Sequence, residues 1–330
     1  AMVQDPALDL AENWQRDFPV CPLPFDSIGR AAGLAAAEVL ALLADLRARD
    51  VLSRIGAAVR PNTIGSSTLA AMSVPAERLD QVAAIVSSHR SVNHNYEREH
   101  RFNLWFVVTA PDRPSVIDAL SELSKATGCP ALDLPIVQPY HIDLGFRLEG
   151  ARRRGLPTRR VHPGDVRLDD ADKRLVARLE NGLDFVPRPY LGLAHALGCS
   201  EDWVMSRVQH LIENGVFSRF GCILRHRPIG FRSNAMAVWD VPDPEVDSIG
   251  QALAAHDAVT LCYRRVRRIP DWPYNLFAMV HGRGELPVRA ELQGLARQTG
   301  LDRFPSAILF SRRCFKQDGA RYFWPERGAA

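Results

Sequence analysis

In both halves of the chain, the spacing of apolar residues changes from helical to strand-like periods in the same order. In the second half, apolar residues recur at helical spacing over 168–182, 189–199 and 200–215, and Ser200 is suited to cap the last of these helices. The apolar and β-branched residues at 216–230 then indicate a two-stranded wing. Three helices followed by a wing predict a winged helix-turn-helix domain.

Alternating β-branched and aromatic residues follow this wing, and two Ala- and Leu-rich segments of helical period interrupt them. The strands are expected at roughly 231–241, 258–267, 273–282 and 305–313, and the helices at roughly 243–256 and 285–299. The order strand, helix, strand, strand, helix, strand is that of the ferredoxin-like fold.

The first half of the chain repeats this plan. Residues 51–75 match 216–242 with one small gap, and residues 93–108 match 261–280. A winged helix-turn-helix is again expected over 25–59, although its first helix is poorly marked. The fold class is therefore α+β: a tandem repeat of a winged helix-turn-helix plus a ferredoxin-like (βαββαβ) domain, which forms an internal pseudo-dimer.

A stretch rich in Arg, Gly and Pro joins the two halves and indicates an exposed linker. The expected domains are a winged helix-turn-helix at 1–65, a ferredoxin-like domain at 66–148, the linker at 149–168, a second winged helix-turn-helix at 169–230 and a second ferredoxin-like domain at 231–330.

Composition narrows the class of protein. The 330 residues include 41 basic and 38 acidic ones, and three of the basic residues are Lys. Arg offers a planar fork for carboxylate or phosphate groups, although a GC-rich genome also favours Arg. Six cysteines occur singly, which favours buried thiols in a reducing compartment over a zinc site. No apolar run approaches membrane-spanning length and no signal peptide is evident, so we expect a cytoplasmic protein without membrane contact.

The chemistry is concentrated where the second strand of each ferredoxin-like domain ends. The first set is His94, Tyr96, Arg98, His100 and Arg101, followed by Trp105, and the second set is Tyr263, Arg264, Arg265, Arg267 and Arg268, followed by Trp272 and Tyr274. Strand alternation would place His94, Tyr96, Arg98 and His100 on one face. Cations beside aromatic rings suit a flat ligand that carries several carboxylates.

Several motifs resemble one family in particular. The order of domains is similar to that of the Lrp/AsnC transcription regulators. However, "RSNAMAVWDVPD" at 232–243, "WPYNLFAMVHGR" at 272–283, "HNYEREHRFNLWFV" at 94–107 and "YHIDLGF" at 140–146 resemble the siroheme decarboxylases, over about the full length of the chain. This resemblance implies an enzyme that converts siroheme to 12,18-didecarboxysiroheme by removing CO₂ from two acetate side chains, in heme d1 biosynthesis. It also implies no separate cofactor, because the iron tetrapyrrole is the substrate.

The residues suggest roles in such a reaction. Arg forks would bind the carboxylates that stay, and an imidazole or a phenol would deliver the proton that replaces CO₂. The candidates for substrate binding are Arg98, Arg101, Trp105, Tyr263, Arg264, Arg265, Arg267 and Tyr274. The catalytic candidates are His94, Tyr96, His100 and His141, of which His94 or His141 could instead be an axial ligand of the substrate iron.

The two halves differ in their imidazoles. Leu261 stands where the first half has His94, and Phe310 or Ser311 stands near the position of His141, which we expect on the last strand of the first sheet. This asymmetry predicts one productive site that belongs mainly to the first half. The sequence leaves open the order of the two decarboxylations, whether one or both halves hold a productive site, and which His is the proton donor.

Two alternatives are a DNA-binding regulator of the Lrp/AsnC type and a heme-binding carrier. A regulator reads bases with the second helix of its helix-turn-helix and needs cations nearby. The corresponding helix at 35–46 contains no Lys or Arg, and the one at 200–206 begins with acidic and aromatic residues, so DNA binding is disfavoured. A carrier would differ only in lacking turnover. The sequence also leaves open whether the fused chain is a monomer or a homodimer.

Overall fold

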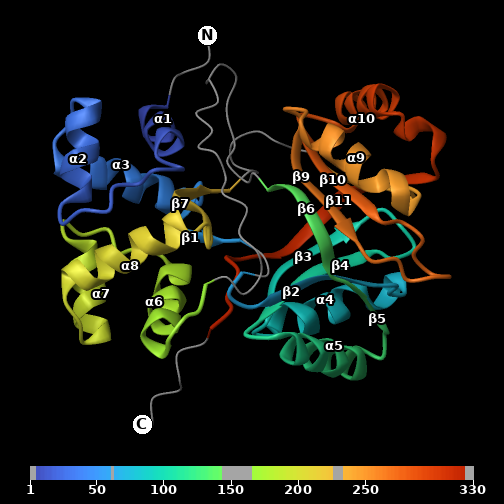
Figure 1. Ribbon diagram of the computed structural model, residues 1–330, viewed down its shortest axis with the longest axis horizontal. Helices are drawn as coiled ribbons and strands as arrows, with labels where there is room; N and C mark the ends of the chain where they lie inside the picture. The colour runs from blue at the N-terminus through green and yellow to red at the C-terminus, as the bar shows by residue number, and fades with distance from the viewer. Residues whose placement is uncertain (1–4, 61–62, 143–165, 226–232, 324–330) are drawn as a thin grey trace. The chain divides into compact units, whose positions relative to one another are not determined.

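The computed structural model describes residues 5–60, 63–142, 166–225 and 233–323 (Figure 1). The chain divides into two compact units: Ala1–Gly65, Gly145–Ile229 and Gly319–Ala330 form the first unit, and Ser66–Leu144 and Gly230–Asp318 form the second. Each unit therefore combines matching segments of both halves. The first unit contains the two helix-turn-helix segments, and the second contains the two ferredoxin-like segments.

The first unit contains three helices from each half. They are α1 (Pro6–Asn13), α2 (Pro24–Ala32), α3 (Ala36–Ala48), α6 (Asp170–Asn181), α7 (Pro189–Leu197) and α8 (Glu201–Glu213). The predicted cap is confirmed, because the Ser200 hydroxyl accepts a hydrogen bond from the Trp203 N–H at 3.1 Å. Among the described residues no single helix is long and apolar enough to cross a membrane, and α2 and α3 meet that test only as a pair bent by 96°.

The described residues do not form the two-stranded wing that the sequence predicts within each half. Strand β1 (Leu52–Val59) pairs antiparallel with β7 (Phe217–Leu224), so each half contributes one strand to a shared two-stranded sheet. Gly56 and Gly221 lie opposite each other, and a Cβ at either would come within 2.6 Å or 2.3 Å of a backbone oxygen. An apolar strand buries equally well against either neighbour, so its periodicity could not reveal the partner.

The segment after the last strand packs within the first unit. Tyr322 is 2% exposed, and its N–H donates to both carboxylate oxygens of Glu180 at 3.0 and 3.2 Å. Burial raises the pKa of Glu180 to about 8. Residues 319–323 therefore pack with the first unit, although the sequence assigned them to the last predicted domain.

The second unit contains two copies of the strand, helix, strand, strand, helix, strand order. The first copy is β2 (Ser66–Met72), α4 (Leu79–Ser88), β3 (Val92–Arg98), β4 (Leu104–Ala110), α5 (Arg113–Thr127) and β5 (Ala131–Leu134), followed by β6 (Ile136–Ile142). The second copy is β8 (Ser233–Trp239), α9 (Asp243–Ala254), β9 (Val259–Arg265), β10 (Leu276–Gly282), α10 (Glu285–Thr299) and β11 (Ser306–Gln317). Short 3₁₀ turns lie at Ala76–Arg78 and Leu301–Arg303. The predicted ferredoxin-like order is confirmed in both halves.

The two copies exchange strands at their edges. The nine strands of this unit follow the order β5-β2-β4-β3-β11-β8-β10-β9-β6 (Figure 1). The first part of β11 pairs with β8, and its second part pairs with β3 of the other half. Strand β6 of the first half pairs in the same way with β9 of the second half. Each half thus completes the sheet of the other.

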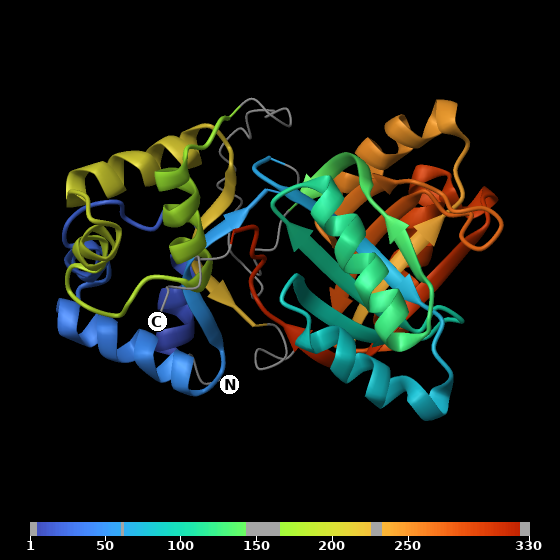
Figure 2. The same ribbon diagram turned by 90° about the horizontal axis from the view of Figure 1, so that it is seen from below.

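The exchange buries three clusters of apolar side chains. One cluster lies between α4, α5 and the strands of the first half, and another lies between α9, α10 and the strands of the second half (Figure 2). The third, which we call the inter-sheet core, takes residues from both halves on the faces that the helices do not cover: Ala71, Phe102, Trp105, Leu134, Met236, Val238, Trp272, Phe277 and Leu309. Because adjacent strand residues point to opposite faces, Ala70 and Phe106 face the helices, whereas Ala71 and Trp105 face this core.

Candidate active site

Strand β3 presents a row of polar side chains on its inter-sheet face. The rings of His94 and Tyr96 stack with centroids 6.3 Å apart, and the Arg98 guanidinium lies 5.7 Å from the Tyr96 ring centroid. Asn95 points the other way and donates to the Ala83 carbonyl of α4 at 3.2 Å. The predicted common face of His94, Tyr96 and Arg98 is therefore confirmed.

Arg98 is a buried cation whose hydrogen-bond acceptors among the described residues are neutral groups. Its side chain is 6% exposed, and its Nη1 donates to the Leu309 carbonyl at 3.1 Å and to the Asn234 Oδ1 at 3.5 Å. Among the described residues no carboxylate pairs with it. Burial lowers the pKa of Arg98 to about 10. A buried guanidinium without a counterion is costly and favours the binding of an external anion.

Arg265 occupies the equivalent position in the second half. It is 9% exposed, donates to the Leu134 carbonyl at 2.8 Å and lies 5.0 Å from the Tyr263 ring centroid. Burial lowers its pKa to about 10 as well. Leu309 and Leu134 come from opposite halves, so the guanidinium of each half is held by a carbonyl of the other half.

The repeated Asn-Leu motif fixes the backbone around both guanidiniums. Asn103 exchanges two hydrogen bonds of 2.9 Å with the backbone of Val74, and Asn275 does the same with Val241. The carbonyl of each Asn also accepts a hydrogen bond from the Arg N–H of its own half, at 2.9 Å for Arg98 and 2.8 Å for Arg265. The two Asn side chains therefore have a structural role.

The sequence did not identify Asn234 and His281, near Arg98, as site residues. His281 on β10 lies directly opposite Asn234 on β8, on the strand pair next to β11. Burial, together with the positive charge of Arg98, lowers the pKa of His281 to about 4. In the sequence only the repeat marks these positions, because the first half has Ser67 in place of Asn234 and Thr109 in place of His281.

The aromatic residues pack mainly against one another. Trp272 is fully buried, and its ring meets those of His100, Trp105 and Tyr274 edge to face at centroid distances of 5.4, 5.0 and 5.0 Å. The Trp105 indole N–H donates to the Phe102 carbonyl at 2.7 Å. Contact of Trp105 or Tyr274 with a substrate stays a prediction, since both belong to or border the inter-sheet core.

His100 and Arg101 lie beyond the end of β3. The Nδ1 of His100 accepts from the Phe102 N–H at 3.1 Å, and burial together with the charge of Arg101 lowers the pKa of His100. Arg101 is exposed and contacts Asp271. His100 thus adjoins the aromatic cluster instead of continuing the row of His94, Tyr96 and Arg98.

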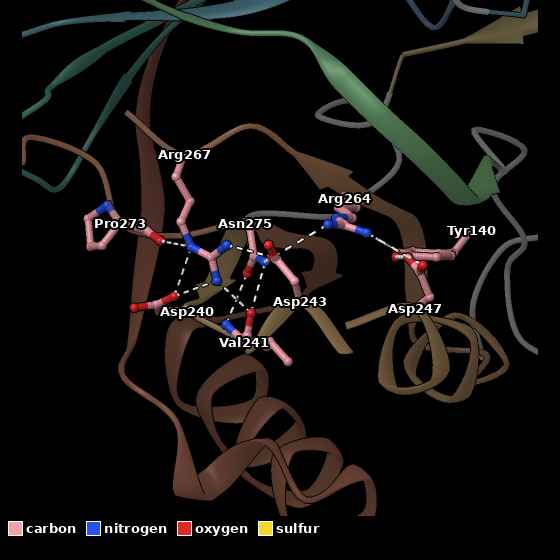
Figure 3. Close-up of polar contacts among 9 residues, drawn as sticks. All are labelled: Tyr140, Asp240, Val241, Asp243, Asp247, Arg264, Arg267, Pro273 and Asn275. Atoms are coloured by element: carbon pink, nitrogen blue, oxygen red, sulfur yellow. Dashed lines mark hydrogen bonds and ion pairs between the residues drawn. The ribbon is translucent and has the colours of Figure 1, made fainter. Parts of the chain in front are cut away.

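The prediction for Arg264 and Arg267 requires a correction, because both pair with acidic side chains of the protein (Figure 3). Arg264 points to the helix face and pairs with Asp243 at 3.4 Å and Asp247 at 3.5 Å. Strand alternation separates it from both of its neighbours on β9.

Arg267 is held by protein acceptors at all three guanidinium nitrogens (Figure 3). Its partners are the carboxylates of Asp240 and Asp243 and the carbonyls of Val241 and Pro273. Arg264 and Arg267 therefore stabilise the β9–β10 connection, and the predicted single set of anchoring cations in the second half is wrong.

His141 also lies elsewhere than predicted. Its strand β6 pairs with β9 of the second half, where His141 faces Cys262 in the register, next to Tyr140, whose hydroxyl donates to Asp247 (Figure 3). Four strands separate β6 from β3 in the sheet order, so the structure does not bring His141 beside His94.

The register also corrects the residue that corresponds to His141. Cys314 faces Tyr96 as Pro139 faces Tyr263, and the same alignment makes Lys316 the counterpart of His141 in place of Phe310 or Ser311. Among the residues that the structure describes, no cluster of three or more His, Cys, Asp or Glu could hold a metal ion, and Cys129, Cys222 and Cys262 are buried.

Two family models match the chain. The model for the AsnC-like ligand binding domain matches residues 64–141 and 228–316, and the model for the siroheme decarboxylase NirDL-like HTH domain matches 10–52 and 172–217. A siroheme decarboxylase NirDL subunit from Paracoccus denitrificans (strain Pd 1222) is 45% identical over 325 residues, which cover 96% of this chain and 97% of that protein. The chain belongs to the siroheme decarboxylase family.

Other members of the siroheme decarboxylase family agree with this assignment. The siroheme decarboxylase of Hydrogenobacter thermophilus is 30% identical and covers 94% of this chain and 93% of its own. A crystal structure of the siroheme decarboxylase NirDL in complex with an iron-uroporphyrin III analogue has a TM-score of 0.70 and 27% identity, and covers 96% of this chain and 95% of that chain. The predicted family and fold class are confirmed.

Proposed function

We propose that this chain is a siroheme decarboxylase that converts siroheme to 12,18-didecarboxysiroheme in heme d1 biosynthesis. The near full-length relatives of that name support the reaction class. The observation that carries the proposal is Arg98, a buried guanidinium whose hydrogen-bond acceptors among the described residues are neutral. Siroheme bears eight carboxylates, and one of these can supply the anion that no described residue offers to Arg98.

Binding follows from the charges of the inter-sheet face. A carboxylate of the substrate that replaces water around Arg98 gains a charge-assisted hydrogen bond in a region of low dielectric constant. Arg265 offers the same interaction to a second carboxylate. Tyr96 and Tyr263 lie against these two guanidiniums, so a planar macrocycle meets an aromatic ring next to each cation.

Each decarboxylation breaks the bond between the acetate methylene carbon and its carboxyl carbon. The electron pair of this bond stays on the methylene carbon, CO₂ leaves, and a C–H bond forms with a proton from a general acid. His94 and Tyr96 are the candidates for this acid, because they share the face of Arg98. His281 is a poorer acid, because a pKa of about 4 keeps its ring neutral near pH 7.

No separate cofactor is needed for this reaction, since the tetrapyrrole ring itself withdraws electrons from the reacting carbon. The substrate iron could take an axial imidazole from His94 or from His141. His94 is the better candidate at the Arg98 site, because it lies on β3 with Arg98, whereas His141 lies on β6, which pairs with β9.

Anaerobic incubation of the purified chain with siroheme, followed by mass measurement of the tetrapyrrole, tests the proposal. We expect two successive losses of CO₂. Binding with an unchanged mass would instead support a heme-binding carrier, and specific retention of promoter DNA without tetrapyrrole turnover would support a regulator. Sedimentation of the same sample distinguishes a monomer from a homodimer of fused chains.

A further inference from the structure

Both hydrogen-bond acceptors of Arg98 come from the other half of the chain. Leu309 lies on β11 and Asn234 on β8, whereas Arg98 lies on β3. The Leu309 contact has a counterpart in the Arg265–Leu134 hydrogen bond, but the Asn234 contact has none, because Ser67 occupies the matching position. The Asn234 amide therefore distinguishes the surroundings of Arg98 from those of Arg265.

His281 is the second difference between the two surroundings. It faces Asn234, the hydrogen-bond partner of Arg98, across the β8–β10 pair, and burial together with the Arg98 charge lowers the pKa of His281. Thr109 stands at the matching position of the first half, opposite Ser67. The Arg98 side therefore combines the guanidinium with an amide and an imidazole, and the Arg265 side combines it with two short hydroxyl side chains.

We propose that Asn234 of the second half is a positioning residue that orients Arg98 toward a substrate carboxylate, and that His281, which lies opposite Asn234 in the register, supports Asn234 and so helps to make the Arg98 side the productive one. This inference rests on the proposed function for the identity of the ligand. The Asn234 Oδ1 and the Leu309 carbonyl both accept from Nη1 of Arg98, and no other described residue accepts a hydrogen bond from its Nε or Nη2. The neutral Asn234 amide therefore holds the guanidinium without supplying a competing anion.

A protein carboxylate beside Arg98 would compete with the substrate carboxylate for the guanidinium. The substitution Asn234→Asp places an anion within reach of the guanidinium and satisfies its charge internally. We expect the variant to be at least as resistant to urea as the wild type, yet to bind iron uroporphyrin III about 30-fold or more weakly. Loss of binding with retained stability separates positioning from a merely structural role.

Milder substitutions replace Asn234 and His281 by the residue types that stand at the matching positions of the first half. Asn234→Ser should weaken binding of iron uroporphyrin III about 3- to 10-fold, as expected for the loss of one hydrogen bond to a charged group. His281→Thr should lower kcat for siroheme more than it raises KM, and His281→Gln, which keeps a neutral polar group, should recover most of the lost rate. Absorbance titration gives the binding, and mass-resolved single turnover gives the rate.

Two matched controls lie in the first unit. Asn181→Asp adds the same charge at an exposed position of α6, and His210→Thr removes an exposed imidazole of α8. Both should behave as the wild type. If Asn234→Asp binds iron uroporphyrin III as tightly as Asn181→Asp, or if His281→Thr turns over siroheme as fast as His210→Thr, the positioning role is wrong.

Failure of this inference and failure of the proposed function give different results. A wild-type chain that decarboxylates siroheme, with Asn234 and His281 variants equal to their controls, keeps the function and overturns the positioning role. A wild-type chain that binds iron uroporphyrin III without any decarboxylation overturns the function. In that case the binding data for Asn234→Asp still decide whether Arg98 is oriented by the second half.

Discussion

The Arg98 and Arg265 regions have the same backbone and different chemistry. Each contains a buried guanidinium above a Tyr ring, held by a carbonyl of the opposite half. Around Arg98 lie His94, Asn234 and His281, and around Arg265 the repeat has Leu261, Ser67 and Thr109. The duplication thus kept a buried guanidinium beside a Tyr ring in both regions, whereas Leu261 and Thr109 stand at the positions that match His94 and His281.

This difference shows that one half alone does not form the imidazole-rich region. His94 comes from the first half, but His281 and Asn234 come from the second. The prediction of a productive site that belongs mainly to the first half is therefore incomplete, because strand exchange brings β8, β10 and β11 beside β3. A fused chain keeps these unlike halves together at a fixed ratio.

The largest expected effect comes from the two guanidiniums themselves. Arg98→Met should lower kcat/KM for siroheme by about 100-fold or more, because a buried carboxylate of the substrate then lacks its cation. The same substitution should leave the resistance to urea unchanged or raise it, since it removes a buried charge that no carboxylate of the described residues pairs with. Arg265→Met is the matched variant, and steady-state kinetics with urea unfolding measure both. Equal losses in the two variants would break the comparison and indicate two equivalent sites.

The next effect concerns the imidazole of β3. His94→Leu copies the residue of the second half and should lower kcat about 100-fold, in the range for loss of a general acid, while binding of iron uroporphyrin III changes little. The converse Leu261→His should not restore activity, because the Arg265 region lacks the amide and the second imidazole. Single-turnover rates together with absorbance titrations test this pair. A His94→Leu variant with full activity would remove His94 from the catalytic candidates and leave Tyr96.

The smallest effect is the contribution of His281 to the pH dependence of stability. The folded pKa of His281, about 4, lies below the usual value of 6.5, so the unfolded chain binds more protons between these values. The contribution of His281 is fully present above pH 6.5 and is lost as the pH falls toward 4, and it amounts to about 1–3 kcal/mol. His281→Thr should make the pH dependence of the free energy of unfolding shallower than in the wild type when urea unfolding is measured between pH 4 and 7. Equal slopes in the variant and the wild type would assign the titration to another group.

The sequence could predict whatever depends on local periodicity. The duplication, the element order of both ferredoxin-like segments and the Ser200 cap follow from spacing along one strand or helix. Strand alternation predicts the common face of His94, Tyr96 and Arg98. The same rule would also have separated Arg264 from Arg265, although it was not applied to them.

Tertiary structure decided which strand lies beside which. Nothing in the period of β1 or β7 shows that they pair with each other, and nothing in β6 or β11 shows that each crosses to the opposite half. These partners are set by the total apolar surface that the assembled sheets bury, which is a property of the whole chain and not of a local segment. For the same reason His281 and Asn234 could be found beside Arg98 only in the folded structure, although the sequence already contained both guanidiniums and their aromatic neighbours.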